Sequence, residues 1–131
     1  ARILKKSGAK EILGINPKSS RKLKGIDSVR RIVDKDGIYS ADVVLVPLED
    51  GDRTIALKKA KKKVITFDLN PLSRTAQTAD ITIVDNTVRA MKLLVTACKK
   101  KKAKPSYNNK KVLSESISEI KKNLQRRAKL A

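Results

Sequence analysis

A group of polar side chains in residues 68–86 has the chemistry needed to hold a phosphorylated ligand. Its members are Asp68, Asn70, Ser73, Arg74, Thr75, Asp85 and Asn86. One apolar run, residues 64–67, precedes the group, and another, residues 81–84, lies within it. If both runs are parallel strands, the polar groups lie at the edge of an open α/β sheet where ligands bind. The stretch 68–86 is therefore the predicted ligand edge of a nucleotide-binding domain.

Each residue type in this stretch suggests a role. The Arg74 guanidinium, the neighbouring hydroxyls and the backbone N–H groups at helix starts after Asn70 and Asn86 can hold phosphate. Asp68 can accept a hydrogen bond from a ribose hydroxyl or an adenine amine, or reach a metal. Alternatively, Asn70, Ser73 and Asn86 only cap helices. Helix capping does not explain why an arginine, Arg74, lies in this loop at the edge of the sheet.

The residues that are missing exclude several classes of chemistry. The chain has no histidine, which excludes Ser-His-Asp and Cys-His catalysis and histidine-ligated zinc sites. It has neither the Gly-x-Gly-x-x-Gly pattern of dinucleotide-binding folds nor a P-loop. The single cysteine, Cys98, falls on the apolar stripe of a predicted helix, so we expect a core residue rather than a nucleophile. One unpaired cysteine also fits a reducing, cytoplasmic compartment.

The high net charge of +19 has two interpretations. It attracts phosphate, in nucleic acid or in small substrates. Alternatively, the lysines form a solvated surface without a specific partner. The lysine runs lack interleaved aromatic residues, and no helix-turn-helix, RRM or zinc-finger pattern is present, which favours the solvated surface. A basic α/β nucleic-acid-binding module remains the alternative function. No run approaches the about 20 apolar residues of a membrane helix.

The hydrophobic pattern predicts an α/β domain. The predicted strands are residues 11–16, 42–47, 63–67 and 81–84, and the predicted helices are residues 2–9, 51–62, 71–79, 87–98 and 114 or 116 to 129. Strands that alternate with helices indicate a Rossmann-like parallel sheet with flanking helices, here with an added C-terminal helix. We expect a nucleotide-binding domain at 1–98, a basic linker at 99–111 and a helix at 112–131. A capping box of Ser116 and Glu119 is expected in that helix.

Two further segments leave alternatives open. Residues 18–40 are irregular, with a short helix predicted near residues 27–33. The cluster at residues 18–21 (Lys-Ser-Ser-Arg) is either a phosphate site or a solvated loop. Three carboxylates, those of Glu49, Asp50 and Asp52, indicate either a metal or amine site or the capping of the next helix.

Four segments together resemble the archaeal 4-phosphopantoate–beta-alanine ligase family, also called phosphopantothenate synthetase. They are Ile-Leu-Gly-Ile-Asn-Pro at 12–17, Pro-Leu-Glu-Asp-Gly-Asp-Arg-Thr at 47–54, Asp-Leu-Asn-Pro-Leu-Ser-Arg-Thr-Ala at 68–76 and Ile-Thr-Ile-Val-Asp-Asn at 81–86. The spacing between them also fits, and the similarity spans residues 1–91. The basic tail does not match in detail.

The resemblance implies an ATP-dependent ligase of coenzyme A biosynthesis. ATP would activate the carboxylate of 4-phosphopantoate as an acyl-adenylate, and the amine of beta-alanine would attack it. Arg74 and Mg²⁺ would supply positive charge. The family's ATP contacts map onto Asp68, Leu69, Asn70, Arg74, Thr75, Asn86 and Thr87. Thr75 stands where the family has Ser or Thr, and Thr87 replaces a residue that is more often apolar. The family is usually dimeric, with the last helix a candidate contact.

Chain length is the main departure from this family. Its members are about twice as long, and their N-terminal half carries further arginines for ATP and one strand of the same sheet. The chain begins without Met, inside a helical pattern, and resembles the C-terminal half of such an enzyme. We therefore expect this stretch alone to be inactive as a ligase.

Overall fold

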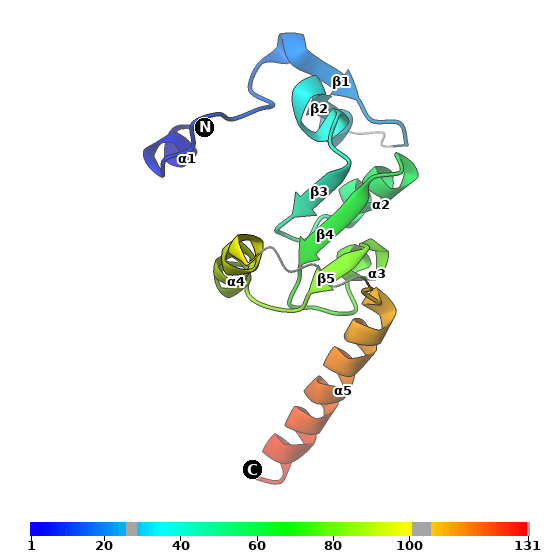
Figure 1. The fold of residues 1–131 in the computed structure, drawn as a ribbon. Helices are drawn as coiled ribbons and strands as arrows, with labels where there is room; N and C mark the ends of the chain where they lie inside the picture. The colour runs from blue at the N-terminus through cyan, green and yellow to red at the C-terminus, as the bar shows by residue number, and fades with distance from the viewer. Residues whose placement is uncertain (26–28, 101–105, 131) are drawn as a thin grey trace.

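The computed structural model of the protein describes residues 1–25, 29–100 and 106–130 and is built around a parallel sheet (Figure 1). Its three strands are β3 (Val43–Val46), β4 (Lys63–Phe67) and β5 (Ile81–Ile83), in the order β3-β4-β5. The register places Leu45 opposite Ile65, and Ile65 opposite Ile81. Helices α2 (Gly51–Lys59) and α3 (Arg74–Thr78) form the two crossovers. The predicted α/β class and these three strands are confirmed.

The core lies between one face of the sheet and helices α2 and α3. Because side chains alternate along a strand, Val44, Val46 and Val64 point to this face and are buried. Leu57 and Ala56 of α2 cover them and are fully buried. Two core threonines are satisfied by backbone carbonyls: the hydroxyl of Thr66 donates to Val46 O at 2.7 Å, and that of Thr82 donates to Ala76 O at 3.0 Å. On the other face, Leu45, Ile65 and Ile81 are only partly buried, whereas Phe67 is 2% exposed.

The N-terminal segment differs from the prediction. Helix α1 (Arg2–Lys6) is present, but the predicted strand at residues 11–16 is wrong. Gly14 adopts a positive φ of 83°, which an extended strand does not allow, and its N–H donates to Asp34 Oδ2 at 3.1 Å. A separate antiparallel pair forms instead, from β1 (Ser20–Lys22) and β2 (Ile32–Asp34). The parallel sheet described here therefore has three strands, whereas four were predicted.

Short irregular helices connect these elements. They are η1 (Pro17–Ser19), η2 (Val29–Arg31) and η3 (Lys35–Tyr39). The helix predicted at residues 27–33 is wrong at its C-terminal end, where residues 32–33 belong to β2. Its first two residues lie outside the described part of the chain.

Helix α4 (Thr87–Lys99) forms where it was predicted, but its apolar stripe is not packed. Val88 is 64% exposed and Val95 50%, and Ala90 is its one buried residue. Cys98 is also exposed, so its prediction as a core residue is wrong. The spacing of the apolar residues correctly predicted an amphipathic helix, but such spacing does not show what covers the apolar face.

Helix α5 (Asn109–Ala128) begins earlier than predicted, because tertiary contacts fix its first turn. Asn108 caps it by accepting from Lys111 N at 3.0 Å. Asn109 accepts from Thr82 N at 2.8 Å, and the Tyr107 hydroxyl donates to Thr82 O at 2.7 Å, so both side chains complete the free edge of β5. The predicted capping box is wrong, since the Ser116 hydroxyl donates to Val112 O within the helix.

Most of α5 extends away from the sheet (Figure 1). Leu113 is its buried residue, and the turns beyond it are largely exposed. Residues 101–105 of the predicted basic linker lie outside the described part of the chain. Within the described residues, no helix is long and apolar enough to cross a membrane.

Candidate functional site

The three loops that follow β3, β4 and β5 meet at the carboxyl edge of the sheet. Asp68 N donates to Ile83 O at 3.2 Å, which joins the second loop to the third strand. The Thr87 hydroxyl donates to Pro47 O at 3.0 Å, across the sheet from the start of α4 to the end of β3. The predicted juxtaposition of residues 68–75 with residues 85–87 is therefore present. The loop at 47–50 joins them.

Asp68 organises the central loop from inside. It is 8% exposed, and its Oδ1 accepts from Asn70 N at 2.9 Å. Its other carboxylate oxygen accepts from the Ser73 hydroxyl. In contrast, Leu69 is 64% exposed and Asn70 is also exposed, while the Asn70 side-chain oxygen accepts from Leu72 N at 3.0 Å. The Asp68 carboxylate thus shapes the loop, and its neighbours face outward.

Arg74 carries an exposed positive charge directly over the start of α2. Its Nη1 donates to Asp52 Oδ1 at 2.9 Å, and its side chain is 66% exposed. Its Cβ, Nε and Cζ lie so close to Gly51 that a Cβ at that position would be 2.9 Å from the Arg74 Cβ. A glycine at position 51 therefore lets the arginine cross the helix N-terminus, where the helix dipole is positive.

Thr75 and Asp50 connect α3 to the start of α2. Thr75 is fully buried, and its hydroxyl accepts from Asp50 N at 2.9 Å. Asp50 in turn caps α2 by accepting from Arg53 N at 3.2 Å. Of the two alternatives for the acidic cluster, Asp50 therefore has the capping role. Residues 1–25, 29–100 and 106–130 contain no group of three or more His, Cys, Asp or Glu placed to hold a metal ion.

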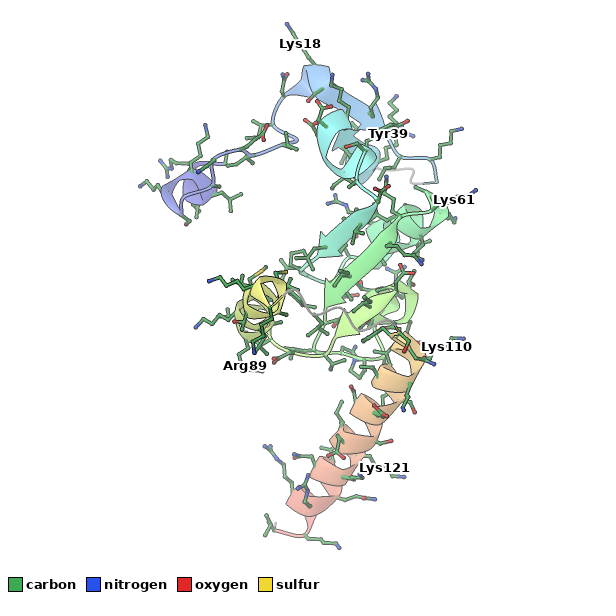
Figure 2. The ribbon with its side chains drawn as sticks, in the orientation of Figure 1. Lys18, Tyr39, Lys61, Arg89, Lys110 and Lys121 are labelled. Carbon is green, nitrogen blue, oxygen red and sulfur yellow. The ribbon has the colours of Figure 1, made fainter. Side chains whose placement is uncertain are left out.

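The third loop supplies the residue that caps the N-terminus of α4. Asn86 caps this helix by accepting from Val88 N at 2.9 Å. Asp85 Oδ1 accepts from Arg89 Nε at 2.9 Å and from Asn86 N at 2.6 Å. The hydrogen bond from Arg89, followed by that from Asn86 N, lowers the pKa of the Asp85 carboxyl below its usual value. Figure 2 shows Arg89 on this helix. The Asp85 carboxylate is therefore ionised and engaged at neutral pH.

Sequence reasoning missed three parts of this edge. Gly51 makes room for Arg74, Asp52 orients its guanidinium, and the Pro47 carbonyl receives the Thr87 hydroxyl. The Asp-Gly-Asp sequence at 50–52 was visible as a cap, but its pairing partners lie more than 20 residues away. The arrangement offers an exposed guanidinium, the N-termini of α2 and α4 and an exposed asparagine, groups that suit a phosphorylated ligand.

The cluster at residues 18–21 has a structural role for at least one of its hydroxyls. The Ser19 hydroxyl donates to Asp34 Oδ2 at 2.5 Å, while Lys18 and Arg21 are exposed. This hydrogen bond, followed by that from Asp36 N, lowers the pKa of the Asp34 carboxyl. Asp34 thereby joins η1, Gly14 and β2.

Comparisons with known proteins identify one family and several relatives of this chain. The family model described as phosphopantothenate/pantothenate synthetase matches residues 1–126. A 4-phosphopantoate–beta-alanine ligase of Methanosarcina mazei is 50% identical over 131 aligned residues, covering 93% of this chain and 51% of that protein. The ligase of the same name from Thermococcus kodakarensis is 49% identical over 127 residues, covering 90% of this chain and 48% of that protein.

A third relative of the same name, from Thermococcus onnurineus, is 62% identical over 80 residues, covering 61% of this chain and 30% of that protein. The chain thus spans about half the length of the first two relatives. The family model nevertheless covers nearly all of this chain. The chain therefore belongs to the phosphopantothenate/pantothenate synthetase family.

Proposed function

We propose that this chain supplies the ATP-binding edge of a ligase that joins 4-phosphopantoate and beta-alanine, a step of coenzyme A biosynthesis. The observation that carries the proposal is the near-50% identity, over at least 90% of this chain, to two proteins named 4-phosphopantoate–beta-alanine ligase. The geometry of the carboxyl edge supports it, because the edge presents positive charge and helix N-termini.

The residues expected to contact ATP divide into two kinds. Arg74, Asn70 and Leu69 are exposed on the central loop and available to a ligand. Asn86 and Thr87 offer the start of α4. Asp68 and Thr75 face inward, so we propose that Asp68 acts by shaping the loop. For Thr75 we propose a contact through its backbone N–H at the start of α3, since its hydroxyl is already bonded to Asp50 N.

The proposed reaction needs positive charge at this edge. A carboxylate oxygen of 4-phosphopantoate attacks the α-phosphorus of ATP, and pyrophosphate leaves with the electrons of the broken P–O bond. The amine nitrogen of beta-alanine then attacks the acyl carbon, loses a proton and displaces AMP. Two anions must approach in the first step, so the Arg74 guanidinium stabilises the charge that accumulates there. Mg²⁺ is proposed to arrive on the ATP phosphates, where it commonly needs few protein ligands.

Titration of ATP tests the proposed edge. Arg74→Ala should weaken ATP binding about tenfold or more, because a charge-assisted phosphate contact is lost. Arg126→Ala, which removes an equal charge from exposed α5, is the matched control and should stay within about twofold. Equal affinity in Arg74→Ala and the parent would contradict the proposal. AMP release that requires both acids, in a protein carrying this chain, tests the ligase itself.

A homodimer is also part of the proposal. Ile117, Ile120 and Leu124 are exposed along α5, at spacings that place them on one side of the helix. Light scattering should give twice the monomer mass. Ile120→Asp should shift the mass toward the monomer if this stripe forms the contact.

A further inference from the structure

A lysine-lined pocket of about 500 Å³ opens at the opposite end of the sheet from the candidate ATP edge. Its walls come from the end of β1 and the following turn, from η3 and from the end of α2. The lining residues are Lys22, Leu23, Lys24, Gly25, Tyr39, Lys59, Ala60 and Lys62. Figure 2 shows Tyr39 and Lys61 at this end, and Arg89 at the other. Among residues 1–25, 29–100 and 106–130, no Asp or Glu lines the pocket.

One ammonium group of the pocket is held in place. Lys62 Nζ donates to Tyr39 O and to Ala41 O, both at 2.7 Å. A lysine ammonium has three donors, so one N–H remains for a ligand. A Cβ at Gly25 would lie 3.3 Å from Lys59 Cδ, which shows that the turn after β1 and the end of α2 are in contact. The lysines of two distant segments therefore converge on one concavity.

The pocket lysines differ from their sequence neighbours in how their charge is balanced. Lys58 and Lys63 point to Asp80, at 2.6 Å and 3.3 Å, and form ion pairs there. Lys22, Lys24 and Lys59 have no carboxylate partner among residues 1–25, 29–100 and 106–130. The end of a helix balances only about half an elementary charge. Within the part of the chain that the structure describes, the pocket thus holds more positive charge than carboxylates and the helix end neutralise.

We propose that this pocket binds an organic di- or triphosphate, at a site separate from the ATP edge. Lysine ammonium groups are point charges that suit phosphate oxygens, and four of them match the charge of such a group. Leu23, Ala60 and the half-exposed Tyr39 form the apolar part of the lining, which can cover an organic substituent. The shared chemistry of the ligand is the linear polyphosphate group.

Calorimetric titration with inorganic tripolyphosphate at about 0.15 M salt tests this site. The double variant Lys24→Glu/Lys59→Glu should weaken binding about tenfold or more. The control, Lys110→Glu/Lys121→Glu, has the same net charge and places its changes on exposed α5 (Figure 2). It should change the dissociation constant by less than about threefold. An equal loss in both variants would show a general charge effect and overturn the proposal.

Two further measurements separate the other ligand sites. In Arg74→Ala, which lacks the proposed phosphate contact of the ATP edge, tripolyphosphate should still shift the backbone N–H signals of the pocket residues Gly25 and Ala60, and loss of these shifts would overturn the proposal. The backbone N–H signals of Gly25 and Ala60 should shift in the NMR spectrum of the parent protein on titration, which keeps the test valid if the double variant unfolds. If titration followed at these two signals gives a lower dissociation constant for ATP than for tripolyphosphate, the organic substituent of the ligand is a nucleoside. Preferential binding of single-stranded RNA there would overturn the small-ligand assignment.

Discussion

Gly51→Ala tests the contact that positions the Arg74 guanidinium. Gly51 is the first residue of α2 and is buried beneath the arginine. An added Cβ would lie 2.9 Å from Arg74 Cβ, 3.1 Å from its Nε and 3.4 Å from its Cζ. The closest of these atoms is attached directly to the backbone of α3, so a rotation of the long side chain does not relieve it. Either α3 or the start of α2 must shift.

Helix propensity and the close contact with Arg74 change the free energy of unfolding of Gly51→Ala in opposite directions. The sign of the measured change therefore shows which of the two dominates. Propensity alone favours alanine over glycine inside a helix by up to about 1 kcal/mol. Overpacking at a close contact costs about 1–3 kcal/mol, and loss of the exposed Arg74–Asp52 ion pair adds at most about 1 kcal/mol. We therefore expect Gly51→Ala to lower the free energy of unfolding by about 1–2 kcal/mol, as the balance of these effects. ATP affinity should fall as well, because the guanidinium is displaced.

Urea unfolding of a double-mutant cycle measures this contact. Arg74→Gly removes all three close atoms, so Gly51→Ala should be neutral or stabilising in that background. The difference between the two backgrounds is the interaction energy of the pair. A stabilised Gly51→Ala single variant would refute the reasoning. So would an equal effect in both backgrounds, since the cost would then come from the backbone of α2 itself.

Three further predictions concern stability. Thr75→Val should cost about 1–3 kcal/mol in urea unfolding, because Asp50 N loses its acceptor, whereas Thr96→Val on exposed α4 should stay within about 0.5 kcal/mol. Leu57→Ala should cost about 2–5 kcal/mol, since this side chain is fully buried, and a smaller loss would mean that the core collapses around the cavity. Burial raises the pKa of the Asp80 carboxyl, but hydrogen bonds, led by that from Lys58, outweigh it and lower the pKa below 3.8. Its carboxylate therefore stabilises the fold above about pH 4, and this contribution is lost as the pH falls through the lowered pKa. Asp80→Asn should flatten this acid-side loss of unfolding free energy, and an unchanged slope would contradict the assignment.

Local signals were sufficient to predict the strands and helix starts around the candidate edge. Val43–Val46 and Lys63–Phe67 are short runs that are rich in β-branched residues and bounded by turns, and they form two adjacent strands of the parallel sheet. Ser73 and Asn86 are helix caps in the structure, which agrees with the alternative that these residues cap helices. A cap depends on residues two or three positions away, so its signal is contained in the sequence window itself.

Contacts between distant segments could not be predicted in the same way. Residues 11–16 have a strand-like composition, but Gly14 turns to meet Asp34, which is 20 residues away. β1 and β2 are three residues each, too short for a periodic pattern. The first turn of α5 depends on Asn109 meeting β5. The misses at residues 11–16 and at the start of α5 therefore have the same physical origin, which is a tertiary contact that overrides a local preference.

Some residues of the carboxyl edge hold its loops in shape, and others are exposed and free to contact a ligand. Substitutions at these two kinds of residue must therefore be interpreted differently. Asp68 is 8% exposed and bonded to both ends of its loop, so Asp68→Ala would disturb the loop and leave Ser73 without its acceptor. Lost ATP binding in that variant would not distinguish a contact from a scaffold. Arg74 is 66% exposed, and its ion pair with Asp52 lies at the surface, where such pairs contribute little to stability. A variant at Arg74 that keeps its unfolding free energy but loses ATP affinity can therefore be attributed to the ligand contact itself.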